Sequence, residues 1–388
     1  MHRTVLFIID GLSGGGAEKV VLTLAEGMAR QGLRVVLVSL RPVCAYPVPD
    51  GVEFVQLEDR YHGPFHRQTE IMRRSADLDL ALRTRFRDGE IDLVVSNLPK
   101  CDRIVAACAF LADAWFCLHN SLVIGQLGRC HGLRRWLKLL RLRRTYSGRK
   151  LITVSRALEL DIQACGIVPQ QWTAIYNPFD IDAIRAQSRQ PCRMENESFL
   201  LHVGRFHRQK RHDRLLEAFK LSGFPGKLVL LGDGMPGSKG QILACAQQLG
   251  IESRIVLPGF VANPFPYMRC AQALLLSSDH EGFGNCIVEA MICGTPVVST
   301  DCEHGPREIL TGELARGLCA LEPAAMAQAI NAVLESPPAI DENSLRRFAV
   351  EHVVSQYLAL LTPCRKARTL PQRQLPDHAE SNELAESL

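Results

Sequence analysis

The chain alternates between short apolar runs rich in β-branched residues and longer segments with the apolar spacing of a helix. In the first half the apolar runs are residues 5–9, 35–40, 91–96, 114–118 and 151–154. Residues 17–31, between the first two runs, repeat apolar side chains at helical intervals. Near-continuous apolar strands separated by helices are typical of a parallel sheet that is covered on both faces. The first half is therefore predicted to be a doubly wound α/β domain.

The same alternation begins again after residues 183–197, a polar stretch that lacks strand character and is interpreted as a linker. The second series contains predicted strands at 199–203, 227–231, 255–257, 273–276 and 296–299, and helices at 214–219, 241–249 and 286–293. A last helical pattern, 344–361, stops before Pro363, and the polar residues beyond it are expected to be disordered.

These patterns predict an α/β protein in which two doubly wound, Rossmann-like domains face one another across a cleft. The predicted parts are a domain at 1–185, a linker at 186–197, a second domain at 198–343, a C-terminal helix at 344–362 that packs back on the first domain, and a disordered tail at 363–388. Ligands of such sheets bind beyond the carboxyl ends of the strands, so the active site is expected between the domains.

Composition narrows the classes of function. With 47% hydrophobic and 22% charged residues among 388, the chain has the balance of a folded, soluble protein. Its net charge of +4 does not point to a nucleic-acid partner. The 14 cysteines include no C-x-x-C pair, which argues against zinc sites and redox dithiols. The first apolar run is too short for a signal peptide and no 18-residue apolar run follows, so a cytoplasmic location is expected.

A glycine-rich loop, residues 11–16, joins the first predicted strand to the first helix. Glycines let a ligand approach the backbone, and the amides at a helix start favour an anion such as a nucleotide phosphate. The spacing matches neither G-x-G-x-x-G nor the P-loop, so dinucleotide and P-loop binding are poorly supported. A turn that serves only chain reversal is the alternative.

The first strand of the second domain ends in a cluster of cations, residues 205–212. Arg205 and Lys210 are spaced so that both could reach one diphosphate, the arginine by paired hydrogen bonds and the lysine as a point charge. Arg208 and Arg211 are more typical of a solvated basic loop.

A second loop that could bind a ligand is formed by residues 277–284. It precedes a helix that is predicted to start near Asn285, a favoured N-cap residue. Glu281 lies in the loop and Glu289 on the second helical turn, and paired carboxylates can accept hydrogen bonds from vicinal sugar hydroxyls. The amides of residues 284–287 could hold hydroxyls or phosphate. Glu289 could also be merely an acid near a helix N-terminus, an explanation that does not apply to Glu281.

Taken together, these motifs resemble those of the retaining glycosyltransferases of the GT-B fold, family 4. The matching segments are GGAEK near the N-terminus, Val154-Ser155-Arg156, Tyr176-Asn177-Pro178, GRFHRQK, the E-x7-E stretch EGFGNCIVE, and CGTPVVSTDCEHGPREIL. Their order and spacing extend over roughly residues 3–362, nearly the whole chain.

The resemblance implies a nucleotide-sugar donor held mainly by the C-terminal domain, and no cofactor. In such enzymes the residues matching Arg205 and Lys210, helped by Gly15 and Gly16, stabilise the diphosphate leaving group. By the same resemblance, Glu281 orients the donor sugar, His119 lies near that sugar, and Glu289 binds the ribose hydroxyls. The backbone around Gly259 and Phe260 is expected to bind the base. The donor site is completed by Phe283, Gly284, Asn285 and Cys286. Cys286 replaces a residue that is often aliphatic in this family.

No convincing D-x-D metal site is present. Asp77 and Asp79 lie in a helical pattern, and Asp180 and Asp182 lie beside the linker. Cations are therefore expected to replace a metal at the departing diphosphate. No carboxylate is placed as a nucleophile for double displacement, so the hypothesis is front-side attack by the acceptor hydroxyl, with the leaving phosphate accepting the proton.

Residues 129–150 contain nine Lys or Arg and no acid. Leu133, Trp136, Leu137 and Leu140 follow the i, i+3, i+4, i+7 spacing, which predicts a basic amphipathic helix suited to an anionic membrane surface. A helix packed on the N-terminal domain with solvated cations is the alternative. Lipid-linked acceptors, which are common in the family, favour the membrane interpretation.

The resemblance thus implies a retaining glycosyltransferase that moves a sugar from a nucleotide donor, expected to be UDP-linked, to a glycan or lipid-linked glycan. The lack of a convincing D-x-D site adds the expectation that it needs no metal. The resemblance also implies a setting in lipopolysaccharide, capsule or polysaccharide biosynthesis at the cytoplasmic membrane face. Two alternatives remain open at this point, a synthase with a soluble acceptor and a non-catalytic nucleotide-sugar-binding subunit. A nicotinamide oxidoreductase is disfavoured because the glycine fingerprint and the ribose-binding acid are not in their places.

Overall fold

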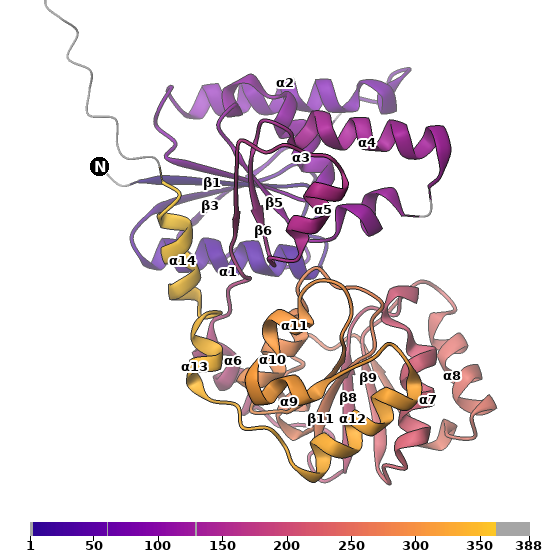
Figure 1. Ribbon diagram of the computed structural model, residues 1–388. Coiled ribbons are helices and arrows are strands. Elements are labelled where there is room, and N and C mark those ends of the chain that lie inside the picture. Colours follow the sequence, from indigo (N-terminus) through magenta and orange to yellow (C-terminus); the bar gives the residue numbers. More distant parts are fainter. Residues whose placement is uncertain (1–2, 60, 129, 362–388) are drawn as a thin grey trace, which may run out of the picture.

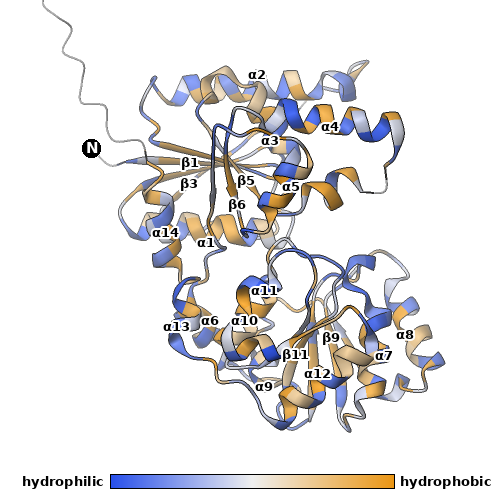
Figure 2. Cartoon of the chain, viewed as in Figure 1, coloured by the Kyte–Doolittle hydropathy of each residue, from blue (hydrophilic) through white to orange (hydrophobic). Residues whose placement is uncertain are grey.

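The computed structural model describes residues 3–59, 61–128 and 130–361 of the chain. It contains two α/β domains, each built around a parallel sheet with helices on its faces (Figure 1). Figure 2 shows that the strands of both sheets are mainly hydrophobic, whereas hydrophilic residues gather on the outer helices. The predicted disordered tail, 363–388, lies outside the described residues.

The N-terminal sheet has the strand order β3-β2-β1-β4-β5-β6-β7, and all its pairs are parallel. Its strands are β1 (Thr4–Ile9), β2 (Arg34–Ser39), β3 (Val52–Gln56), β4 (Leu93–Asn97), β5 (Trp115–Leu118), β6 (Lys150–Thr153) and β7 (Gln171–Ala174). The helices are α1 (Gly16–Arg30), α2 (His66–Arg85), α3 (Pro99–Ala107), α4 (Gly132–Tyr146) and α5 (Leu158–Ala164), with short turns η1 (Ala109–Leu111) and η2 (Val123–Leu127). Alternate residues of β1 enter different apolar clusters, as Phe7 and Ile8 do, so both faces of the sheet are covered.

The C-terminal sheet has the order β10-β9-β8-β11-β12-β13 and is also parallel. Its strands are β8 (Phe199–Val203), β9 (Lys227–Leu231), β10 (Ile255–Gly259), β11 (Ala273–Leu276), β12 (Val297–Thr300) and β13 (Leu318–Cys319). The helices are α6 (Ile181–Ser188), α7 (His212–Ser222), α8 (Ser238–Gln248), α9 (Phe265–Cys270), α10 (Asn285–Ile292), α11 (Pro306–Ile309) and α12 (Pro323–Glu335), with turns η3 (Arg208–Lys210), η4 (Glu252–Arg254) and η5 (Gly312–Gly317).

The apolar runs predicted from the sequence form the central strands of both sheets and the edge strand β10, but β3, β7 and β13 were not predicted. All three are edge strands. β3 leaves most of its residues partly or fully exposed, β7 has no fully buried residue, and β13 is only two residues long. Edge strands need no continuous apolar run, because only part of their surface is covered.

The boundary between the two domains lies at different residues from those predicted. Residues 181–188 are not the end of the first domain and the start of a linker, because they form α6, which packs on α9 and α10 of the C-terminal domain. Asp180 caps this helix by accepting a hydrogen bond of 2.9 Å from the backbone N–H of Ala183. Ile184 is buried on the C-terminal side, so the chain leaves the N-terminal domain before α6 rather than at residue 185.

The predicted helix at 344–362 is divided into α13 (Glu342–Arg346), which packs on α10, and α14 (Val350–Leu358). α14 lies against α1 of the N-terminal domain (Figure 1). Gly27 permits this approach, since a Cβ atom at that position would lie 2.6 Å from Cγ2 of Val350. The end of the described chain therefore returns to the first domain.

Candidate active site

Loops after β1, β5 and β6 of the N-terminal domain contact loops after β11 and β12 of the C-terminal domain. The Ser155 hydroxyl donates to the carbonyl oxygen of Gly282 at 3.0 Å. The Glu308 carboxylate accepts from the backbone N–H groups of Arg156 and Ala157 at 2.9 and 2.8 Å. The carboxyl ends of strands in both sheets therefore meet, as expected for a site between two domains.

Lys210 and Glu281 form an ion pair on the C-terminal side of this region. Lys210 Nζ lies 2.7 Å from Glu281 Oε1, and the side chains are 16% and 11% exposed. The hydroxyl of Ser278 donates to the same carboxylate oxygen at 2.6 Å. The stem of Lys210 passes Gly204, where a Cβ would lie 3.2 Å from Lys210 Cε, so this glycine leaves room for the lysine.

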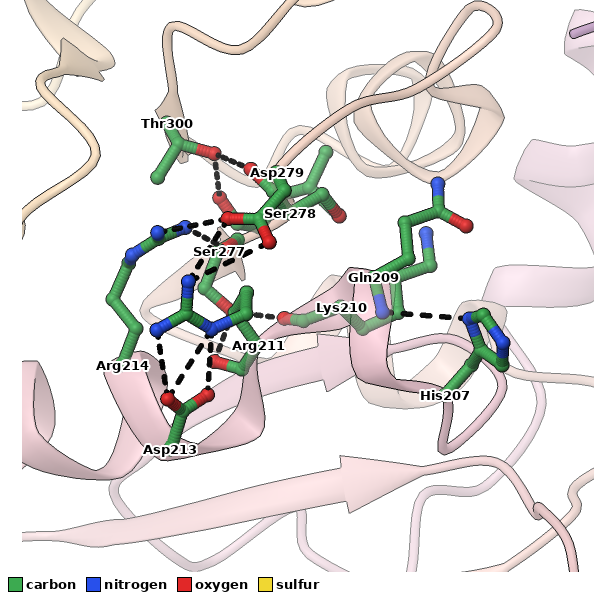
Figure 3. A network of polar contacts seen from close by, with 11 residues as sticks. His207, Gln209, Lys210, Arg211, Asp213, Arg214, Ser277, Ser278, Asp279 and Thr300 are labelled. Atoms are coloured by element: carbon green, nitrogen blue, oxygen red, sulfur yellow. Dashed lines mark hydrogen bonds and ion pairs between the residues drawn. The ribbon is translucent and has the colours of Figure 1, made fainter. Parts of the chain in front are cut away.

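A polar network holds the loop that carries Lys210 against the loop that follows β11 (Figure 3). The Ser277 hydroxyl donates to the carbonyl oxygen of Lys210 at 2.6 Å. The backbone N–H of Asp279 donates to the Gln209 carbonyl at 2.9 Å, and its carboxylate pairs with Arg214 at 2.8 Å. Arg211, which the sequence suggested was solvated, instead pairs with Asp279 and with Asp213. The network therefore fixes the backbone from which the Lys210 side chain extends.

The charge of Lys210 follows from its surroundings. Burial by itself lowers the pKa of this ammonium group, but the Glu281 carboxylate outweighs that effect and the pKa is raised from its ordinary value. Lys210 is therefore protonated at neutral pH. Arg205, on the same β8–α7 connection, has an exposed side chain, and no hydrogen bond or ion pair within the described chain engages its guanidinium. It is available for an anionic ligand.

Glu289 lies on α10 with its side chain 11% exposed. Its Oε1 pairs with Nζ of Lys19 at 2.8 Å. Lys19 belongs to the GGAEK segment of the N-terminal domain, and sequence reasoning gave it no role.

The N-cap of α10 is not the residue predicted from the sequence. Asn285 is the first residue of the helix rather than its N-cap, which is Gly284 in the left-handed conformation with φ of 102°. The Asn285 side chain instead accepts a hydrogen bond of 2.7 Å from the amide of Asn177 on the crossover between the domains. Gly16 adjoins the same side chain, since a Cβ there would lie 3.4 Å from Asn285 Nδ2. Gly15 is the N-cap of α1.

His119 follows β5 and is buried beside Asn97. Its Nε2 lies 2.9 Å from Asn97 Oδ1. The Asn97 amide nitrogen donates to the carbonyls of Ile8 and Val95, so its oxygen is the acceptor and Nε2 of His119 carries the hydrogen. Burial lowers the pKa of His119 to about 4, so the imidazole is neutral at pH 7 with a lone pair on Nδ1.

Other predicted donor residues have different surroundings. Phe283 is buried, with its ring 5.6 Å from Tyr176 and 5.7 Å from Phe348, so its side chain stabilises the domain junction and only its backbone remains for a ligand. Burial raises the pKa of Cys286 to about 12, which keeps the thiol neutral. Gly259 and Phe260 lie at the end of β10, and no contact recorded for the described residues joins them to Lys210, Glu281 or Glu289.

Two further features were missed by sequence reasoning. An alanine Cβ at Gly282 would overlap the carbonyl oxygen of His119, so the two domains approach closely at this glycine. Asp161 of α5 bonds to the Ser121 hydroxyl and lies 3.1 Å from Nε2 of His304 in the C-terminal domain. Gly282 and His304 both lie in the quoted motifs, but their contacts depend on partners far away in the sequence.

The candidate D-x-D pairs have structural partners. Asp79 pairs with Arg83 and accepts from the backbone N–H of Phe110, and Asp180 caps α6. Among residues 3–59, 61–128 and 130–361, no group of three or more His, Cys, Asp or Glu side chains is placed to hold a metal ion. In the same ranges no helix is both long and apolar enough to cross a membrane.

The site therefore combines two buried carboxylates, a partly buried ammonium group, a guanidinium with no partner among the described residues and the amino end of α10, with residues of both domains around them. Carboxylates accept hydrogen bonds from hydroxyl groups, and the cations with the helix amides attract phosphate. The arrangement suits a ligand that carries both hydroxyls and phosphate.

Comparison with known proteins gives two family matches. The model described as Glycosyltransferase Family 4 matches residues 14–183, and that described as Glycosyl transferases group 1 matches residues 197–336. A Campylobacter jejuni relative, N-acetylgalactosamine-N,N'-diacetylbacillosaminyl-diphospho-undecaprenol 4-alpha-N-acetylgalactosaminyltransferase, is 25% identical over 80% of this chain and 83% of its own. The lipopolysaccharide 1,6-galactosyltransferase of Salmonella typhimurium is 33% identical over 42% of this chain and 47% of its own, which is about half its length.

Among solved structures, HepE of Anabaena in complex with UDP-glucose is similar with a TM-score of 0.73 and 22% identity, over 92% of this chain and 99% of that chain. The lipopolysaccharide outer core galactosyltransferase WaaB gives a TM-score of 0.66 at 21% identity, over 92% and 98%. At these identities the likeness establishes the fold.

Proposed function

The chain belongs to the glycosyltransferases that the two family models describe and has their GT-B fold, and from this premise we propose that it is a retaining, metal-independent enzyme that uses a UDP-sugar. The observation that carries the proposal is the buried Lys210–Glu281 pair at the junction of the domains. It brings a protonated cation for a diphosphate next to a carboxylate for sugar hydroxyls.

The donor site is assigned to the C-terminal domain. Lys210 and Arg205 bind the diphosphate, Glu281 orients the sugar and Glu289 binds the ribose. The complexes of HepE with UDP and with UDP-glucose support a uridine nucleotide. Isothermal titration calorimetry with UDP, GDP and ADP tests the nucleotide, and a preference for GDP or ADP would refute this assignment.

The proposed chemistry is departure of UDP followed by attack of the acceptor hydroxyl from the same face. Lys210 and Arg205 stabilise the negative charge that develops on the diphosphate, and the leaving phosphate takes the acceptor proton. The ion pair of Glu281 with Lys210 and its bond from Ser278 favour an orienting role over that of a nucleophile. His119 is neutral and adds no charge to the sugar site.

Two measurements test this mechanism. NMR of the product should show that the anomeric configuration of the donor is kept, and an inverted product would refute front-side attack. Activity should be unchanged in EDTA, whereas loss that Mg²⁺ or Mn²⁺ restores would refute metal independence.

The acceptor is proposed to be a surface glycan that is built on a lipid. The names of two relatives support this class, since one acts on a diphospho-undecaprenol-linked sugar and the other on lipopolysaccharide. The test compares lipid-linked oligosaccharide with the same oligosaccharide released from lipid, and equal rates would favour a soluble acceptor.

A membrane contact through α4 is proposed on the exposure of its first half. Leu133, Trp136 and Leu137 are 70%, 55% and 49% exposed, whereas Leu142 and Tyr146 near the other end are buried. The exposed apolar side chains therefore project from the domain among basic residues, rather than packing on it. This combination suits an anionic bilayer surface. Residue 129, at the start of the predicted segment, lies outside the described residues.

Vesicle co-sedimentation tests this contact. Wild type should bind vesicles that contain phosphatidylglycerol, and a Leu133→Ser/Trp136→Ser variant should lose most of that binding. Val168→Ser, which changes an apolar residue that is 73% exposed elsewhere in the N-terminal domain, is the matched control. Equal binding of all three proteins would refute the proposal.

A further inference from the structure

Lys19 lies in the first turn of α1, at the amino end of a helix. The helix dipole disfavours a cation at this position and favours an acid such as its neighbour Glu18. Glu18 is buried and accepts a hydrogen bond of 2.8 Å from Ser13, within its own domain. The dipole of its own helix therefore does not stabilise the charge of Lys19, and the partners of its ammonium group lie elsewhere.

Those partners belong to the other domain. Nζ of Lys19 lies 2.8 Å from Oε1 of Glu289 on α10 and 4.7 Å from the ring centroid of Phe265 on α9. The close packing of Gly16 beside Asn285 brings the start of α1 up to the start of α10. Both an ion pair and a cation–π contact thus place Lys19 over the C-terminal domain.

The carboxylate of Glu289 is held at one oxygen only. Oε1 accepts from Lys19, and within the described chain no hydrogen bond is recorded to Oε2. The side chain is 11% exposed, so its charge is compensated chiefly by Lys19. A carboxylate anchored at one oxygen presents the other in a fixed direction, which suits an acceptor for ribose hydroxyls.

We propose that Lys19 is a positioning residue that anchors and charge-compensates Glu289, so that the ribose subsite of the C-terminal domain is complete only when the N-terminal domain is docked on it. The inference rests on the proposed role of Glu289 in binding the donor. It makes nucleotide affinity sensitive to a residue that does not itself contact the nucleotide.

The experiment compares UDP with 2′,3′-dideoxy-UDP, which lacks the hydroxyls that Glu289 would bind. Titration calorimetry is carried out on wild type, Lys19→Met, Lys19→Arg and Glu289→Gln. In Lys19→Met the Kd for UDP should rise about tenfold or more, the effect of losing a charge-assisted contact. The Kd for dideoxy-UDP should be unchanged, and Lys19→Arg should restore most of the affinity for UDP.

Arg30→Met is the matched control. Arg30 is on the same helix and pairs with Asp180 at 2.6 Å, so its loss also removes a contact between α1 and the domain crossover. This variant should leave the ratio of the two affinities unchanged. A loss for both nucleotides in Lys19→Met, or none for either, would overturn the role of Lys19 alone. Wild type that binds neither nucleotide would overturn the proposed donor and this inference with it.

Discussion

Replacing Gly282 by alanine should disable catalysis while leaving both domains folded. An added Cβ would overlap the carbonyl oxygen of His119 and lie 2.9 Å from its carbonyl carbon, closer than the 3.0 Å below which real Cβ contacts are essentially never found. The obstacle is backbone rather than a flexible side chain. Gly282 does not have a left-handed φ, so the change introduces no backbone strain of its own.

The magnitude follows from the movement that alanine requires. The loop that carries Glu281 and the loop that carries His119 must separate by about 1 Å, and a misplacement of that size costs about a hundredfold in rate. The corresponding increase in the activation barrier is about 2.7 kcal/mol. The nucleotide is assigned to the C-terminal domain, so its affinity should change far less than the rate.

The assay is the rate of UDP release from the UDP-sugar that wild type turns over, combined with calorimetric UDP binding and thermal unfolding. Gly240→Ala on α8 is the control, because a Cβ at that position meets nothing within 4 Å. It should keep wild-type activity. If Gly282→Ala turns over within about threefold of wild type, the close approach of the two loops does not control the geometry of the reaction.

Three further perturbations follow from the geometry. Lys210→Met should lower kcat about a thousandfold by removing a buried cation from the diphosphate, whereas Arg208→Met, an exposed neighbour, should have little effect in the same steady-state assay. His119 has a pKa of about 4 when folded against an ordinary value of 6.5, so the unfolded chain binds its proton first as the pH falls. The stabilisation that comes from neutral His119 is therefore complete above pH 6.5 and falls by up to about 3 kcal/mol towards pH 4. Between pH 7 and pH 4.5, urea unfolding should show a larger loss of unfolding free energy for wild type than for His119→Gln. Equal losses in the two proteins would contradict this. Gly27→Leu should lower the free energy of unfolding by about 1–3 kcal/mol by forcing α14 from α1, and an unchanged denaturation midpoint would show that the contact is dispensable.

The sequence by itself determined the central strands of both sheets, and its motifs supplied most of the residues that are proposed for the donor site. Central strands are buried on both faces, so their apolar runs are continuous and need no partner to be recognised. The cluster with Lys210 and the loop with Glu281 were recognisable because each lies within a few residues of a strand end. Edge strands such as Val52–Gln56 gave no such signal, because most of their residues remain at least partly exposed.

Only the tertiary structure decided which of these residues meet. Lys19 and Glu289 are 270 residues apart in the sequence, and the approach of Gly282 to His119 joins two different domains. The position of α14 was likewise decided by the tertiary structure, because its packing on α1 depends on the space left by Gly27. A linear pattern encodes burial and local conformation, whereas the contact between two domains depends on the shapes of surfaces that are built from residues far apart in the sequence.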